Sequence, residues 1–110
     1  MIFEVAIIDI KPGGAEEFER GVAKALPVFS RAKGYKSLRL ERSIETPLRY
    51  RLVVGWETVE NHVLDFRNSP DFQLWRSLVG HTFAAPPTVE HTAVILSGPE
   101  SVGDNEQNSN

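Results

Sequence analysis

The spacing of hydrophobic positions changes several times along this chain, and each spacing predicts an element. Residues 2–10 carry apolar side chains on both alternating faces, as a strand covered on both sides does. Pro12–Gly14 then ends the strand. From Ala15 to Lys33 apolar residues recur every three or four positions, which predicts an amphipathic helix, and Gly34 suits the position after its end.

The second half of the chain shows the same change from alternation to helical spacing. Two strands, Tyr35–Ile44 and Leu48–Trp56, are separated by a short turn and form a hairpin. Thr58 is suited to cap the next helix, and Pro70 begins a second helical segment after a break. A fourth strand is expected over Thr88–Leu96.

This order of elements predicts the fold class. Strand, helix, strand, strand, helix, strand is the order of a ferredoxin-like split βαβ domain, an α+β fold. The expected sheet is antiparallel and carries both helices on one face. Because the first strand is apolar on its other face as well, we expect a second subunit to cover that face. Residues 1–96 form this domain, and residues 97–110 are expected to be a flexible polar tail.

Composition narrows the range of functions. The 110 residues suffice for one domain with a core, and the net charge is −3 without any basic stretch, so neither nucleic acid nor membrane is an expected partner. There is no cysteine, which excludes a disulfide or a thiol nucleophile. The N-terminal strand has no signal-peptide pattern, and a cytoplasmic location is expected. The three histidines show no metal-ligand spacing, so no metal is expected.

The stretch Gly55–Arg76 is the most informative in the chain. It places two tryptophans, two phenylalanines, a histidine and two arginines where a strand gives way to a broken helix. Aromatic rings mixed with a few polar groups are typical of a small-molecule pocket. They are equally typical of a core between helices and a sheet, and each ring can serve as core or as pocket wall.

Particular residues in this stretch carry a resemblance to a known family. Trp56-Glu57, followed by the run Phe66–Arg76 (FRNSPDFQLWR), resembles the antibiotic biosynthesis monooxygenase domain family, and the turn at Pro12-Gly13 and the segment Pro86–His91 fit it too. The resemblance covers residues 1–96. It implies a homodimeric α/β barrel made of two ferredoxin-like sheets packed face to face, with a pocket between sheet and helices in each subunit. Some members oxygenate aromatic polyketides or quinols without metal or flavin, and others degrade haem.

The haem-degrading branch fits this sequence poorly. Its members share an asparagine, a tryptophan and a histidine at places that align with Ala6, Phe66 and Arg76, and all three differ here. Quinol-oxygenating members often carry a histidine where this chain has Phe66. His62, one helical turn earlier, can present its imidazole to the same cavity.

The leading hypothesis is therefore a cofactor-independent monooxygenase, acting as a homodimer with dioxygen on a small aromatic phenol, quinol or polyketide-like substrate. The candidate catalytic residues are His62 or His81 as the base and Arg76, or a tryptophan N–H, as the oxyanion donor. The candidate substrate-binding residues are the aromatic side chains Trp56, Phe66, Phe72, Trp75 and Phe83.

Other interpretations remain open, both for two of the histidines and for the function of the whole chain. His81 near a helix end has a structural interpretation, and His91 shares a strand face with Val89 and Ala93 as a core or interface residue. The whole chain also fits a non-catalytic ligand-binding or stress-associated dimeric domain. A third hypothesis is a cofactor-free isomerase or cyclase.

Overall fold

A computed structural model describes residues 1–102; residues 103–110 of the expected tail lie outside the described range. None of the helices in residues 1–102 is long and apolar enough to cross a membrane. The predicted order of elements is confirmed. The elements are β1 (Ile2–Asp9), α1 (Ala15–Ser30), β2 (Tyr35–Arg42), β3 (Arg49–Trp56), the π-helix η1 (Asn61–Phe66), α2 (Pro70–Val79), the 3₁₀ turn η2 (Gly80–Thr82) and β4 (Thr88–Thr92).

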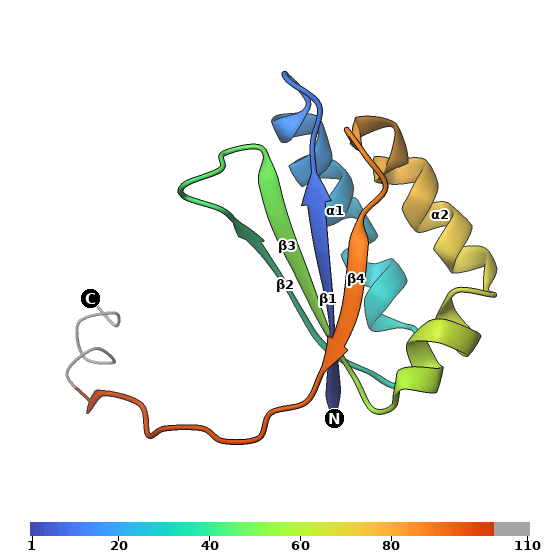
Figure 1. The fold of residues 1–110 in the computed structure, drawn as a ribbon. Coiled ribbons are helices and arrows are strands. Elements are labelled where there is room, and N and C mark those ends of the chain that lie inside the picture. Colours follow the sequence, from blue (N-terminus) through green and yellow to red (C-terminus); the bar gives the residue numbers. More distant parts are fainter. Residues whose placement is uncertain (103–110) are drawn as a thin grey trace.

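The strands form one antiparallel sheet in the order β2-β3-β1-β4. Figure 1 shows α1 and α2 together on one face of this sheet, with the other face uncovered. β1 lies at the centre between β3 and β4, and its register places Glu4 opposite Val54 on one side and His91 on the other. This is the expected α+β, ferredoxin-like architecture.

The core lies between the sheet and the helices because the alternate residues of the strands meet the apolar stripes of α1 and α2 there. Burying one large apolar side chain contributes about 2 kcal/mol, so this layer supplies most of the driving force for folding. The largest fully buried side chains are Trp56, Tyr50, Phe18, Phe29, Ile8, Ile10, Leu52, Val54 and Val79.

Gly21 sets how closely the two helices approach each other. A Cβ atom at this position would lie 2.7 Å from the Leu78 carbonyl oxygen and 2.8 Å from a Val79 methyl group. Any larger residue would force α1 and α2 apart. The close approach brings α2 down over the end of the sheet where β1 and β4 pair.

The fourth strand is shorter than the sequence predicted. It ends at Thr92 rather than Leu96; Thr92 pairs with Phe3, and β1 begins only one residue before Phe3, at Ile2. Residues 93–96 have no strand beside them and run away from the sheet (Figure 1). Helix α1 also ends earlier than expected, at Ser30 rather than Lys33. Gly34 adopts the left-handed conformation with φ of 82°.

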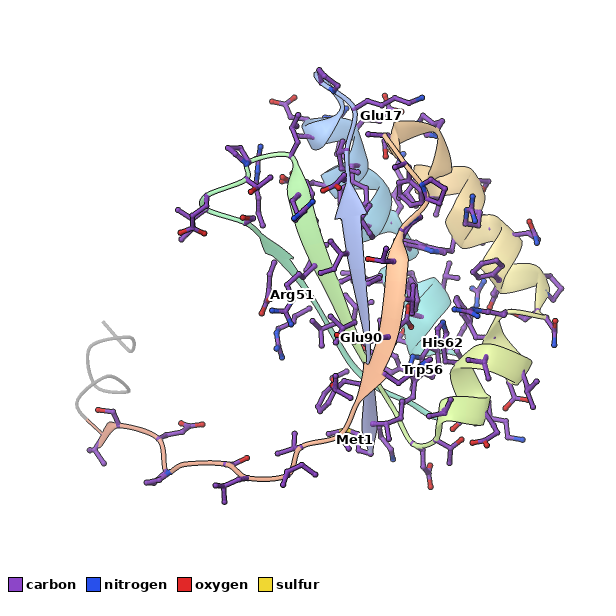
Figure 2. The ribbon with its side chains drawn as sticks, in the orientation of Figure 1. Met1, Glu17, Arg51, Trp56, His62 and Glu90 are labelled. Carbon is purple, nitrogen blue, oxygen red and sulfur yellow. The ribbon has the colours of Figure 1, made fainter. Side chains whose placement is uncertain are left out.

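The uncovered face of the sheet combines an apolar centre with a charged margin. Val5 and Val53 pair across β1 and β3 and are only 7% and 4% exposed, while Phe3 and Ile7 are half-buried. Arg51 lies on this face, away from the helices, whereas Trp56 and His62 lie on the helix side (Figure 2). Ion pairs between arginine and acidic side chains surround the apolar centre; they are Arg49–Asp9, Arg39–Glu41 and Arg51–Glu41.

Candidate active site

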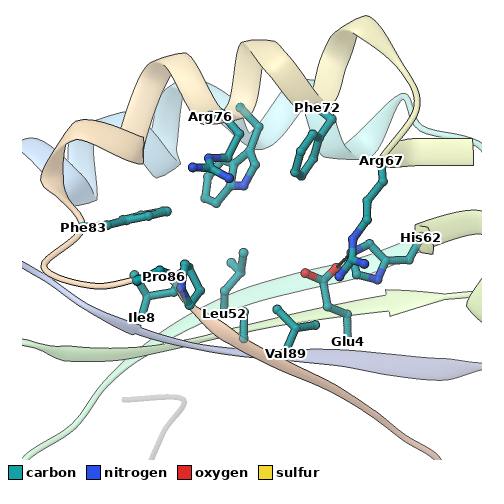
Figure 3. A pocket seen from close by; sticks show the side chains of 13 residues that line it. Glu4, Ile8, Leu52, His62, Arg67, Phe72, Arg76, Phe83, Pro86 and Val89 are labelled. Atoms are coloured by element: carbon teal, nitrogen blue, oxygen red, sulfur yellow. Dashed lines mark ion pairs between the residues drawn. The ribbon is translucent and has the colours of Figure 1, made fainter. Parts of the chain in front are cut away.

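A pocket of about 270 Å³ lies between the sheet and α2, on the helix-covered face. Figure 3 shows Phe72 and Arg76 reaching into it from α2, with Ile8, Leu52 and Val89 of the sheet opposite them. Phe83, Pro86 and Pro87, from the segment between η2 and β4, close one end. This segment is held beside the end of β1, because Phe83 forms a bridge with Ile10 and the Ala84 N–H donates to the Asp9 carbonyl at 2.8 Å.

Most of the pocket wall is apolar. Trp75 is 6% exposed and packs edge-on against Phe29, with ring centroids 5.0 Å apart, so one side of it belongs to the core and the other to the pocket. The ring planes of Phe72 and Phe66 lie at 86° to each other, which is also an edge-to-face contact. Arg76 lies over the Phe83 ring with its guanidinium carbon 5.8 Å from the centroid, which holds a cation at the pocket wall.

The polar end of the pocket is formed by Glu4, His62 and Arg67 (Figure 3). Glu4 is 6% exposed, and its Oε1 accepts a hydrogen bond of 3.0 Å from the indole Nε1 of Trp56. The Nε2 atom of His62 lies 3.4 Å from the same carboxylate oxygen. The His62 ring stacks on Trp56 at 16° with centroids 5.9 Å apart, so the indole orients both members of the pair.

Burial decides the protonation of this pair. It raises the pKa of Glu4 from 4.5 to about 7, while the Trp56 hydrogen bond and the Arg67 charge act in the opposite direction. Burial, together with the smaller effects of the neighbouring Arg67 and His91, lowers the pKa of His62 from 6.5 to about 4. Near neutral pH the site therefore combines a half-ionised carboxyl with a neutral imidazole.

The π-helix η1 positions His62. The Arg67 N–H donates to the His62 carbonyl at 3.1 Å, one residue farther along than in an α-helix. Asn61 anchors the start of η1, because its Oδ1 accepts from the Thr58 N–H at 3.0 Å and from the Thr58 hydroxyl at 2.9 Å. Thr58 in turn accepts from the Asn61 N–H, which confirms it as the predicted cap. Gly34 permits this arrangement, since a Cβ there would overlap the Asn61 amide.

Comparison with known proteins now identifies the family. The model of the antibiotic biosynthesis monooxygenase family matches residues 1–78. This chain belongs to that family. It is also 42% identical over 92 residues to YczJ of Bacillus subtilis (strain 168), a protein described as uncharacterized, which covers 83% of this chain and 96% of YczJ.

Solved structures of the antibiotic biosynthesis monooxygenase family share the fold. A Bordetella bronchiseptica protein, named as a proposed antibiotic biosynthesis monooxygenase, is 56% identical with a TM-score of 0.86, covering 86% of this chain and 97% of that one. SnoaB from Streptomyces nogalater, described as a cofactor-independent oxygenase, superposes with a TM-score of 0.77 over 90% of this chain and 97% of its own. At 17% identity, SnoaB shows the common fold and no more.

The structure brings five of the predicted site residues to one pocket. Those that line it are His62, Arg76, Phe72, Trp75 and Phe83. Trp56 lies directly behind the polar end, fully buried, with its N–H directed to Glu4. Phe66 lies in the core against Phe29 and Trp56. His81 lies elsewhere, on the surface beyond α2, in an ion pair with Glu17 of α1.

Two polar residues of the pocket, Glu4 and Arg67, were not singled out from the sequence. Glu4 occupies a helix-facing position of β1 between Ile2 and Ala6, where the alternation calls for an apolar residue. A lone carboxylate among buried positions of a central strand is a signal that could have identified it. Arg67 directly follows η1 and gives no comparable signal.

The places compared with the haem-degrading branch can now be located. Ala6 and Arg76 line the pocket, and Phe66 packs in the core, so none of the three presents an imidazole or amide there. Among residues 1–102, no three His, Asp or Glu side chains gather closely enough to hold a metal ion.

Proposed function

We propose that this chain is a cofactor-independent monooxygenase that oxidises a small aromatic phenol, quinol or polyketide-like substrate. The observation that carries the proposal is the pocket itself, which has aromatic and aliphatic walls, one polar end with a buried Glu4–His62 pair, and a cation at Arg76. A flat ring with one acidic hydroxyl matches this distribution of apolar and polar surface. Membership of the family, and the oxygenase description of the structural relative SnoaB, support the reaction type.

In the proposed reaction, different pocket residues bind the substrate ring, accept its proton and stabilise negative charge. The substrate ring lies between Phe72 and Phe83 on one side and Leu52 on the other, with its hydroxyl at the polar end. The Glu4–His62 pair receives the hydroxyl proton, and Arg76 stabilises negative charge on a substrate oxygen. The electron-rich anion reduces dioxygen directly. One oxygen atom becomes a new carbonyl on a ring carbon that loses its hydrogen, and the other leaves as water with that hydrogen and the hydroxyl proton, so the substrate supplies all the electrons.

Oxygen uptake with a panel of hydroquinones and anthrones tests this function. We expect uptake with at least one compound and a loss of about 10²-fold or more in His62→Ala. The matched control is His81→Ala, which removes a histidine outside the pocket and leaves the rate unchanged. No uptake with any compound, or equal rates in both variants, would contradict the oxygenase proposal.

A cofactor-free isomerase or cyclase is the second candidate, because a buried acid–base pair can transfer protons without oxygen. The same panel under nitrogen separates the two. Substrate conversion that needs no oxygen would replace the oxygenase proposal by this one. Tight binding without conversion in either atmosphere would favour the non-catalytic ligand-binding or stress-associated domain.

We also propose that the chain is a homodimer joined through the uncovered face of the sheet. No helix of residues 1–102 covers the apolar centre formed by Phe3, Val5, Ile7 and Val53, and Phe3 and Ile7 remain partly exposed there. The segment Val94–Leu96 beyond β4 is exposed at 61%, 93% and 90%, which adds a second apolar surface beside this face. The alternating arginines and acids at the margin can pair with the same residues of a second copy.

Light scattering of the native protein tests the dimer. We expect twice the monomer mass, and a shift to the monomer in Ile7→Glu, which introduces a charge at the centre of the face. Leu26→Glu, at an exposed apolar position of α1, is the matched control and stays dimeric. A native protein at monomer mass would contradict the proposal.

A further inference from the structure

Glu4 is a buried carboxyl that a structural role does not require. Its Oε1 accepts the Trp56 N–H at 3.0 Å, but a glutamine amide oxygen would accept the same hydrogen bond without any charge to bury. Glu4 also points into the pocket and lines it, as Figure 3 shows. A carboxyl that is both buried and directed at a ligand space has the features of an acid–base group.

A continuous line of proton-carrying atoms leads from Glu4 to the edge of the sheet. Glu4 Oε1 lies 3.4 Å from His62 Nε2, and His62 Nδ1 lies 2.9 Å from His91 Nε2. His62 is 3% exposed, whereas His91 is half-buried on the edge strand β4. The three groups therefore connect the polar end of the pocket with solvent, and they come from β1, η1 and β4.

We propose that Glu4 is the group that takes the substrate's proton, and that His62 and His91 form a relay that exchanges this proton with solvent. This inference rests on the proposed function, since it needs a bound substrate with an acidic hydroxyl. It assigns to His62 the transfer of the proton rather than its removal from the substrate.

The proton balance of the relay is complete within these groups. The substrate O–H bond breaks as an O–H bond forms on Glu4, and the electron pair stays on the substrate oxygen. Glu4 then gives the proton to His62 Nε2 while the hydrogen on His62 Nδ1 passes to His91 Nε2, and His91 releases its other ring proton to water. The return path runs in the opposite order, and it supplies the proton that the departing oxygen atom needs to form water.

The charged neighbours of the pair favour Glu4 as the group that accepts the substrate's proton. Arg67, after η1, and Arg76, on α2, both line the pocket and place positive charge near its anions. The Arg67 charge favours the ionised form of Glu4 and the neutral form of His62. With a pKa of about 7, Glu4 is matched to proton exchange near neutral pH.

Ionisation of bound 4-nitrophenol under nitrogen tests the role of Glu4 without any oxygen chemistry. The phenolate absorbs visible light and the phenol does not, so its spectrum reports whether the proton has left. We expect the native protein to ionise the bound phenol at a pH at which the free phenol is still largely neutral, and Glu4→Gln to leave it neutral. Equal ionisation by the native protein and Glu4→Gln, or none by the native protein, would overturn the assignment.

A pH jump with the phenol already bound tests the relay. The bound phenol then occupies the pocket, and under the proposal the proton reaches Glu4 through His62 and His91. We expect the absorbance change to slow by about 10-fold or more in His62→Gln and His91→Ala, with rescue of His91→Ala by added imidazole. His81→Gln is the matched control and keeps the native rate. Native rates in both relay variants, or no rescue by imidazole, would overturn the relay.

These outcomes are distinguishable from failure of the oxygenase proposal. Phenol ionisation by Glu4 without oxygen uptake on any substrate would leave the relay standing and remove the oxygenase. Oxygen uptake that Glu4→Gln leaves unchanged would keep the oxygenase and remove the assignment of Glu4.

Discussion

The described part of the chain holds two carboxylate–histidine pairs, and they differ in almost everything except their chemistry. In Glu4–His62 the side chains are 8% and 3% exposed, and the pair lies at the polar end of the pocket. In Glu17–His81 they are 54% and 56% exposed, and the pair links α1 to η2 on the surface. The comparison shows that burial, rather than the pairing of residue types, makes a site out of an acid and a base.

Folding moves a proton within the buried pair, from His62 in the unfolded chain to Glu4 in the folded chain. Around pH 5.5 an unfolded chain carries an ionised Glu4 and a protonated His62, whereas the folded chain carries a neutral acid and a neutral imidazole. The number of bound protons is the same in both states. The pair as a whole therefore contributes little pH dependence to stability in this range, although each member alone would contribute a large one.

Removing one member at a time should reveal two opposite pH trends, and this is the largest effect that we expect. In Glu4→Gln only His62 remains, and the unfolded chain binds more protons between pH 4 and 6.5, so stability should rise with pH over that interval. In His62→Gln only Glu4 remains, and the folded chain binds more protons between pH 4.5 and 7, so stability should fall. Each trend should amount to about 3 kcal/mol.

Denaturant unfolding at several pH values, at one protein concentration, measures both trends. Other groups such as Asp9 and Asp71, whose pKa values are lowered by arginine partners, contribute equally to the native protein and to both variants. The differences from the native protein therefore isolate the pair. Parallel curves for the two variants would show that the pair is not neutralised by burial.

The Trp56 N–H is the next feature to test, because it joins the core to the buried pair. Trp56→Phe removes the donor from Glu4 Oε1 and leaves space in a fully buried position, which we expect to cost about 2–3 kcal/mol. Since this hydrogen bond lowers the pKa of Glu4, its loss should raise that pKa further. A higher pKa makes Glu4 a stronger base, so the pH at which bound 4-nitrophenol ionises should move downward.

Trp75→Phe is the matched control for this change. It makes the same substitution in a side chain that lines the pocket and packs against Phe29. We expect a loss of stability without any downward movement of the ionisation pH. Equal movement in both variants would mean that the pocket's polarity, and not the indole donor, sets the pKa of Glu4.

The contrast between the pairs also shows what the sequence could predict. The change between alternating and helical spacing was enough to predict the order of elements, the helix-covered face and the uncovered face. It also led to His62, Arg76 and three aromatic residues of the pocket wall, because each lies at a recognisable place on a helix or a turn. A family resemblance restricted the search to one stretch of the chain.

Glu4 was not predicted as a site residue because its position in the pocket depends on contacts between distant segments. Its partners come from β3, η1 and β4, and only the antiparallel register brings them together. His81 was predicted as a site residue because of its position in the sequence alone. It is a histidine near the end of the same helical region, but sequence spacing carries no information on whether a side chain reaches a pocket several residues away. The end of β4 was also mispredicted, because Ala93–Leu96 are apolar but have no strand beside them.

The exposed pair provides the smallest expected effect and the control for the whole comparison. A pair in water gains little, because solvent screens both charges and both side chains lose freedom when they meet. We expect Glu17→Gln, His81→Gln and the double variant to change the free energy of unfolding by less than about 1 kcal/mol, with an interaction term near zero in the double-mutant cycle. The same cycle on Glu4 and His62 should give an interaction that changes with pH, since each substitution leaves a buried group without its neutral partner. If the two cycles gave similar interaction terms at every pH, burial would not be what separates the pairs, and the acid–base role of Glu4 would lose its physical basis.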